Sequence, residues 1–201
     1  MKRRHFLATG SAFAAALAQP RWVLALDADD PYRKDIGIQL YTLRNEIKSD
    51  VVGTIKAVAD AGYKQVEPYG FPNADDMIRE AKANGMSVNS SHINSDAILY
   101  PDRKGTTPLA EILDKANDLG LTHLVIPYLA NDLRDSLDKY KMVAERCNQA
   151  ADQADKAGIQ LAYHNHAFEF KPMDNGKCGY DVFRDEFSDK MKFEVDVFWV
   201  A

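Results

Sequence analysis

The residues best suited to chemistry lie in two segments near the end of the chain. Segment 161–169 contains His164 and His166, and segment 193–198 contains Asp196. Side chains alternate between the two faces of a strand, so His164 and His166 are predicted to share the inward face of their strand. By the same alternation, Asp196 is predicted to point inward from the adjacent strand. Imidazole nitrogens and a carboxylate oxygen suit Zn²⁺, Mn²⁺, Co²⁺ or Fe²⁺. Burying these three groups without partners costs several kcal/mol, which favours a shared site.

Other polar residues are predicted at or just after the ends of strands. Glu67 ends one short apolar segment, His92 ends the next, and Glu169 follows the histidine pair. In parallel α/β folds, ligands bind at the C-terminal ends of the strands. Taken singly, His92 is also typical of a hydrogen-bonded structural histidine, and Glu67 of a loop carboxylate paired with Lys or Arg.

The elements that must position these residues repeat along the chain. An amphipathic helix ends in glycine and a short apolar strand follows, with joints at Gly62, Gly85, Gly120 and Gly158. Glycine just past the last helical turn supplies the left-handed conformation there. The predicted strands cover residues 36–41, 65–67, 87–92, 123–127, 160–164 and 193–198. Segment 133–157 is predicted to be helical, as one helix or two.

Alternating strands and helices predict an α/β fold with a parallel sheet covered on its faces. No G-x-G-x-x-G follows the first strand, which weakens a dinucleotide-binding open sheet. A full (β/α)8 TIM barrel takes typically about 250 residues. We therefore predict a TIM barrel truncated after about six βα units, as a fragment of a longer protein. A doubly wound open sheet is the alternative.

The first 18 residues resemble an export signal. Lys2, Arg3 and Arg4 precede an apolar run that ends at Ala18 and is too short to span a bilayer. The paired arginines resemble the twin-arginine signal. We predict a signal peptide over 1–18, a linker over 19–34, the barrel over 35–201 and a periplasmic location. A disordered basic N-terminus or an uncleaved anchor is the alternative.

Composition narrows the partners. With 46% hydrophobic and 27% charged residues, the chain is an ordinary globular sequence. Lys and Arg number 25 against 30 Asp and Glu, a net charge of −5, so nucleic acid is a poor partner. We expect no stable membrane insertion, and a homo-oligomer is left open.

Five segments together resemble a known family: 36–42, 62–67, 90–92, 158–170 and 194–196, with 163–170 the most specific. They are similar to the sugar phosphate isomerase/epimerase superfamily, the xylose isomerase-like TIM barrels, and to its exported members. The resemblance covers the whole chain after the signal.

This resemblance implies one divalent metal ion, Mn, Zn, Co or Fe. Family members bind it through a Glu on strand five, an Asp on strand six, and a His and a Glu on strands seven and eight. Asp196 matches the strand-six ligand, while His164 occupies the strand-five position in place of Glu. The other two ligands are expected beyond Ala201.

The resemblance also implies proton abstraction next to a carbonyl, with the metal stabilising the resulting enediolate. The candidate acid/base residues are Glu67, His92, His166 and Glu169. Isomerisation, epimerisation and β-elimination stay open, and a neutral or oxidised sugar is the expected substrate.

Two alternatives of other classes remain. The first is a non-catalytic sugar-binding barrel that has lost a complete metal site. The second is a DNA-repair nuclease like endonuclease IV, which the acidic charge and the export signal disfavour.

Overall fold

The computed structural model describes residues 35–200, so the predicted signal peptide and linker lie outside the described residues. The strands are β1 (Gly37–Gln39), β2 (Gln65–Glu67), β3 (Ser90–His92), β4 (His123–Ile126), β5 (Gln160–His164) and β6 (Met191–Glu194). The α-helices are α3 (Arg44–Ser49), α4 (Val51–Asp60), α5 (Asp75–Ala83), α6 (Asp96–Leu99), α7 (Leu109–Asp118), α8 (Leu137–Lys156) and α9 (Gly179–Glu186). Four 3₁₀ turns are η1 (Leu40–Leu43), η2 (Asn131–Leu133), η3 (Ala167–Phe170) and η4 (Asp174–Gly176).

All strand pairs are parallel and follow the order of the chain. β1 pairs with β2, and β3, β4, β5 and β6 form a second group in that order. A parallel bridge between Gln65 and Ser87 joins the groups, and there the Val66 N–H donates to the Ser87 carbonyl at 3.0 Å. Within residues 35–200, β1 and β6 each pair with one strand only. Consecutive parallel neighbours joined by helices are the arrangement of a partial barrel.

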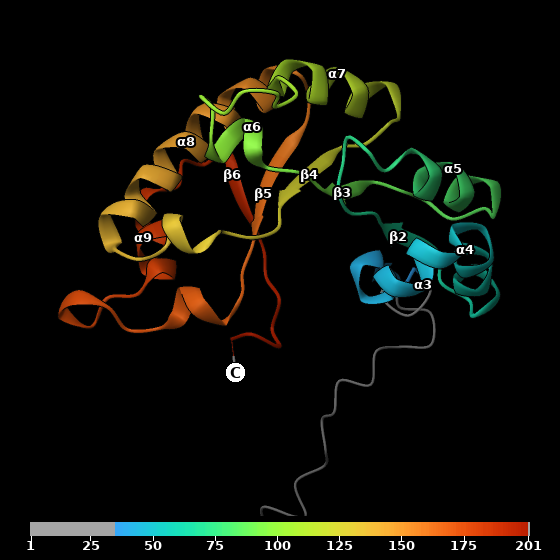
Figure 1. The fold of residues 1–201 in the computed structure, drawn as a ribbon, viewed down its shortest axis with the longest axis horizontal. Helices are drawn as coiled ribbons and strands as arrows, with labels where there is room; N and C mark the ends of the chain where they lie inside the picture. Colours follow the sequence, from blue (N-terminus) through green and yellow to red (C-terminus); the bar gives the residue numbers. More distant parts are fainter. Residues whose placement is uncertain (1–34, 201) are drawn as a thin grey trace, which may run out of the picture. The chain divides into compact units, whose positions relative to one another are not determined.

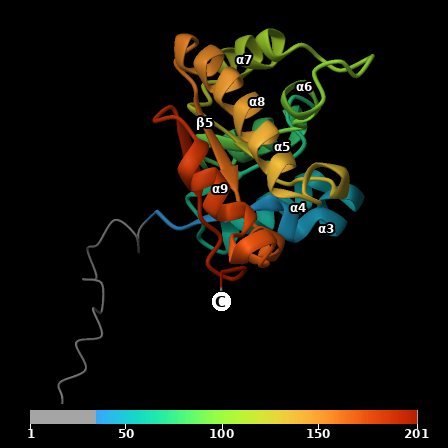
Figure 2. The ribbon, with the colours of Figure 1, turned by 90° about the vertical axis from the view of Figure 1, so that its left-hand side faces the viewer.

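The helices surround the strands on one side. In Figure 1, α4, α5, α7, α8 and α9 form an arc around them, and Figure 2 shows α8 and α9 side by side next to β5. Leu161 and Tyr163 of β5 are buried in the core that these helices share, and the Tyr163 ring packs on Phe183 of α9 at 4.7 Å between centroids. Leu161 and Tyr163 therefore face the helices, and His164 lies on the opposite face of β5, as predicted.

Glycines end the helices as predicted. Gly85 after α5 and Gly158 after α8 have φ of 74° and 76°, the left-handed region that costs glycine no Cβ strain. The segment left open as one helix or two is one 20-residue helix, α8, preceded by η2. The Ser136 hydroxyl caps its start by accepting the Lys139 N–H at 3.3 Å.

The last strand ends earlier than the sequence predicts. β6 stops at Glu194 instead of continuing to 198, because side chains take over its backbone groups. The Asp196 N–H donates to Asn165 Oδ1 at 3.0 Å, and Asn165 Nδ2 donates to the Asp196 carbonyl at 3.0 Å. The Phe198 N–H then donates to Asp196 Oδ1 at 2.9 Å. Such side-chain bonds compete with strand pairing.

The strand β5 is also too short to hold both histidines on one face. For His164 and His166 to share one face, the chain would have to stay extended through residues 161–169. β5 ends at His164, so His166 is not on its inner face but in the turn that leads into η3. None of the helices between residues 35 and 200 is both long and apolar enough to cross a membrane.

Candidate metal centre

Four side chains from four strands converge at the C-terminal ends of those strands. Glu67 ends β2, His92 ends β3, His164 ends β5 and Glu194 ends β6. Parallel strands end at the same edge of a sheet, which brings these residues together although up to 127 positions separate them in the sequence. We call these four residues the strand-end cluster.

Glu194 is the centre of the cluster. Its Oε1 lies 2.9 Å from His92 Nε2 and 2.8 Å from His164 Nδ1. His92 Nε2 also lies 3.0 Å from Glu67 Oε1, and the Ser90 hydroxyl donates to the other oxygen of Glu67. His92 and Glu67 are largely buried, with side-chain exposures of 8% and 13%. One ligand atom each of His92, His164 and Glu194 fits within 4.8 Å.

The charges in the cluster stabilise one another. Burial lowers the pKa of His92, but hydrogen bonds to Glu194 and Glu67 outweigh it and raise that pKa to about 9. Burial likewise raises the pKa of Glu194, and its bonds to His164 and His92 outweigh this and lower the pKa to about 2. The raised pKa favours the protonated form of His92, whose Nε2 lies between the carboxylates of Glu67 and Glu194.

The donor set fits a divalent metal. Two imidazole nitrogens and a carboxylate oxygen converge on a small volume, the combination that Zn²⁺, Mn²⁺, Co²⁺ and Fe²⁺ accept. His92, His164 and Glu194 would hold the ion, with Glu67 adjacent. Of the two ligands predicted from the sequence, His164 is in this group.

Glu194 is the residue that sequence reasoning missed. The signal was present, because Glu194 lies two positions before Asp196 and therefore on the same face of a strand. In the structure Glu194 is the register partner of His164, which places their side chains next to each other.

Asp196 lies on the other side of the His164 ring. Its Oδ2 is 3.7 Å from His164 Nε2, whereas Glu194 approaches Nδ1. A metal-binding histidine uses one ring nitrogen and commonly turns the other towards a carboxylate. The geometry suits Asp196 for orienting the ring, and its predicted role as a ligand stays a prediction.

His166 lies beside the cluster. Its ring centroid is 5.1 Å from that of His164, and it stacks on Phe168 and Trp199 at 5.5 Å each. Burial above all, with the nearby charge of His164, lowers the pKa of His166 to about 4, so the ring is neutral at neutral pH. A neutral imidazole next to the cluster is compatible with the predicted acid/base role.

Glu169 is not brought to the cluster. Its carboxylate is fully buried and accepts the Tyr163 hydroxyl at 2.6 Å and the His166 N–H at 2.8 Å. Tyr163 faces the helices, so these bonds hold Glu169 in the packing of the turn after β5. Its predicted catalytic role stays a prediction.

The pH dependence of stability in the Glu169→Gln variant tests whether Glu169 has a structural role. Burial raises the pKa of Glu169 above 4.5, against the bonds from Tyr163 and the backbone. The stabilising contribution of the neutral form is thus fully present below pH 4.5 and is lost as pH rises through the folded-state pKa. The free energy of unfolding of the variant, relative to wild type, should therefore rise as the pH increases above 4.5 in denaturant titrations. A pH-independent difference would contradict this.

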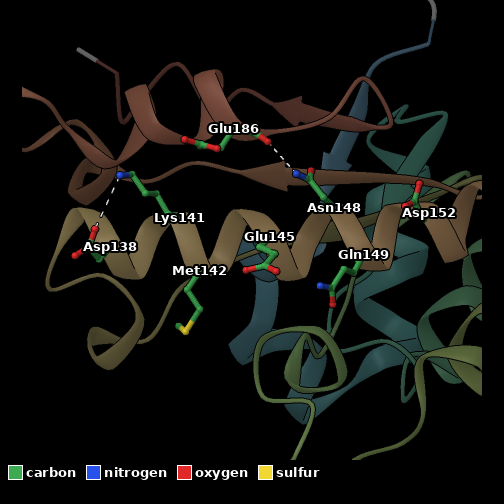
Figure 3. Close-up of a pocket in the computed structure, with 8 residues that line it drawn as sticks. All are labelled: Asp138, Lys141, Met142, Glu145, Asn148, Gln149, Asp152 and Glu186. Carbon is green, nitrogen blue, oxygen red and sulfur yellow. Dashed lines mark hydrogen bonds and ion pairs between the residues drawn. The ribbon is translucent and has the colours of Figure 1, made fainter.

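A second surface feature lies away from the cluster. Figure 3 shows an open groove along α8, where Lys141 pairs with Asp138 at 4.0 Å and Asn148 Nδ2 donates to the Glu186 carbonyl at 2.8 Å. Exposed side chains of α8 line most of this groove. None of the catalytic or metal-binding residues predicted from the sequence lines it.

The comparison with known families decides the assignment. The family described as xylose isomerase-like TIM barrel matches residues 55–200. The chain belongs to the xylose isomerase-like TIM barrel family. The predicted superfamily and the α/β barrel class are thereby confirmed, with the chain forming part of a barrel.

Solved structures agree with the xylose isomerase-like fold. A sugar phosphate isomerase/epimerase from Parabacteroides distasonis shares 28% identity at a TM-score of 0.64, over 83% of this chain and 66% of its own. A xylose isomerase-like TIM barrel protein from Mycobacterium smegmatis, in complex with magnesium, shares 13% at 0.58, over 84% and 66%. D-psicose 3-epimerase with D-tagatose from Clostridium cellulolyticum H10 shares 16% at 0.56, over 82% and 64%.

The similarity to the Mycobacterium smegmatis and Clostridium cellulolyticum proteins shows a shared fold only. The chain spans about two thirds of the length of these xylose isomerase-like structures. A search of curated proteins finds none with significant similarity to it.

Proposed function

We propose that this xylose isomerase-like protein is a metal-dependent isomerase or epimerase, or a β-eliminating lyase, acting on a sugar or keto-sugar by proton abstraction next to a carbonyl. The convergence of His92, His164 and Glu194 within 4.8 Å carries the proposal. The similarity to a sugar phosphate isomerase/epimerase and to the fold of a D-psicose 3-epimerase supports the substrate class.

The roles of the side chains follow from their contacts. A divalent cation held by the cluster would polarise the substrate carbonyl and stabilise the enediolate that proton removal produces. Glu67 is the base that we assign, because it is the one member of the strand-end cluster outside the group of three that would hold the metal. The Ser90 hydroxyl fixes one Glu67 oxygen and His92 faces the other, so the carboxylate is held in one orientation. His166, neutral and beside His164, is a second acid/base group.

Solvent exchange tests this function across a panel of sugars. The full-length protein is incubated with Mn²⁺ or Co²⁺ in D₂O and a set of ketoses and keto-sugar acids, and NMR follows the proton next to the carbonyl. We expect exchange that stops with a chelator and returns with the metal. Sugar binding without exchange of any panel member would reject the enzyme and favour the non-catalytic sugar-binding barrel.

We also propose that the protein acts after export to the periplasm, on the strength of the basic and apolar pattern over residues 1–18. The mass of the protein recovered from the periplasmic fraction tests this, because removal of the signal shortens the chain by about that length. Recovery of the uncleaved protein in the cytoplasm would reject it.

A further inference from the structure

An arginine lies beside the aromatic surroundings of the cluster and forms no salt bridge within residues 35–200, although its charge acts to lower the pKa of the buried Glu169 carboxyl. Arg134 follows η2, and its Cζ is 3.6 Å from the centroid of the Phe168 ring and 5.0 Å from that of Tyr128. The guanidinium is always charged, so its charge is available to a ligand.

The guanidinium is held in place while part of it stays free. Nε donates to Asn131 Oδ1 at 3.0 Å, and Nη2 donates to the Tyr128 hydroxyl at 2.9 Å and also to Asn131. Among the described residues, Nη1 of Arg134 has no acceptor. The Tyr128 hydroxyl accepts from Arg134 and donates to no other residue that the structure describes, and Tyr128 is 47% exposed. Two donors, one of them charged, are thus presented together.

These donors are two ring contacts away from the cluster. Tyr128 meets His166 edge to face at 5.3 Å between centroids, and His166 meets His164 at 5.1 Å. Trp199 stacks on the same His166 ring. A continuous run of rings thus joins these donors to the cluster, and aromatic rings pack well against the apolar C–H groups of a sugar.

We propose that Arg134 and Tyr128 bind the anionic end, a carboxylate or a phosphate ester, of an acidic sugar whose other end lies at the strand-end cluster. The proposal rests on the proposed function, whose substrate class it narrows. Charge-assisted hydrogen bonds from Arg to such groups are among the stronger polar contacts, and Asn131 and Phe168 fix the guanidinium before the ligand arrives.

Binding measurements test this independently of turnover. The Mn²⁺-loaded full-length protein is titrated by calorimetry with D-glucose, D-glucuronate and D-glucose 6-phosphate. We expect at least one anionic sugar to bind about 10-fold or more tightly than D-glucose, and Arg134→Gln to abolish the difference. The identity of the tighter anion distinguishes the carboxylate from the phosphate. Tyr128→Phe, which keeps the ring, should lose part of the preference.

Arg103 provides a matched control. It also lies over a tyrosine ring, that of Tyr100 at 3.9 Å, but Asp96 pairs with it at 2.8 Å. Arg103→Gln should leave the preference unchanged. If Arg134→Gln fails to fold, as judged by its melting curve, Tyr128→Phe and Arg134→Lys are measured in its place. Lys keeps the positive charge but lacks the planar guanidinium that donates several hydrogen bonds and packs on the Phe168 ring.

Equal binding of all three sugars by the wild type, no binding of any, or a preference that survives in Arg134→Gln would overturn the proposal. These outcomes are separate from those of the proposed function. Exchange on neutral keto-sugars without any anion preference would retain the enzyme and remove the anion site. Arg134-dependent binding of an acid without exchange of any sugar would do the reverse.

Discussion

Glu194→Gln is expected to lower the affinity of the protein for Mn²⁺ or Zn²⁺ by more than about 100-fold. The substitution keeps the size of the side chain but removes the charge that lies between two imidazoles, 2.9 Å from His92 and 2.8 Å from His164. Two histidines without the carboxylate cannot neutralise a divalent ion. Calorimetric titration of the metal-free protein measures the loss.

Two further variants serve as a control and as a comparison for this result. Glu145→Gln removes an exposed carboxylate on α8, outside the cluster, and should leave metal affinity unchanged (Figure 3). Asp196→Asn should cost about 10-fold, as expected for a group that orients a ligand. If Asp196→Asn abolishes binding while Glu194→Gln binds normally, the ion is held at Nε2 of His164 and the ligand role predicted from the sequence is correct.

Glu67→Gln is expected to slow metal-dependent solvent exchange of the substrate by about 10²- to 10⁴-fold, the usual contribution of a general base. Gln can still accept from His92 and pair with Ser90, so the fold should be kept, and metal affinity should change by less than about 10-fold. Exchange rates followed by NMR at saturating metal, together with the metal titration, separate the two effects.

Glu169→Gln is the matched control, because it neutralises a buried carboxylate that makes no contact with the strand-end cluster. It should retain exchange within a few-fold. Loss of exchange in Glu169→Gln with retention in Glu67→Gln would reverse the assignment and restore the catalytic role predicted for Glu169.

The sequence was sufficient for the order and direction of the elements. Helices that end in glycine and apolar segments of strand length are local features, so β2, β4 and β5 were predicted within a residue at each end. Alternation along a strand is local as well. It placed His164 on the inward face without reference to any tertiary contact, and the burial of Tyr163 against the helices agrees with this.

Distances between elements are not local features of the sequence. These distances determine which residues form the strand-end cluster. Glu194 is the centre of the cluster because the β5–β6 register sets it beside His164, and because β3 brings His92 to it across 102 positions. No period in the sequence encodes that register, which depends on the packing of the helices between the strands.

The backbone around Glu169 and around Asp196 departs from the predicted extended path for the same physical reason. After β5 and β6 end, side chains bind the backbone in place of a neighbouring strand: Glu169 accepts the His166 N–H, and Asn165 holds both backbone groups of Asp196. The period-two reading assumed an extended chain through both segments. By itself the sequence determined the barrel-type repeat and the inward-facing His164. The tertiary structure decided which carboxylate meets that histidine, because only the folded backbone sets where each strand stops.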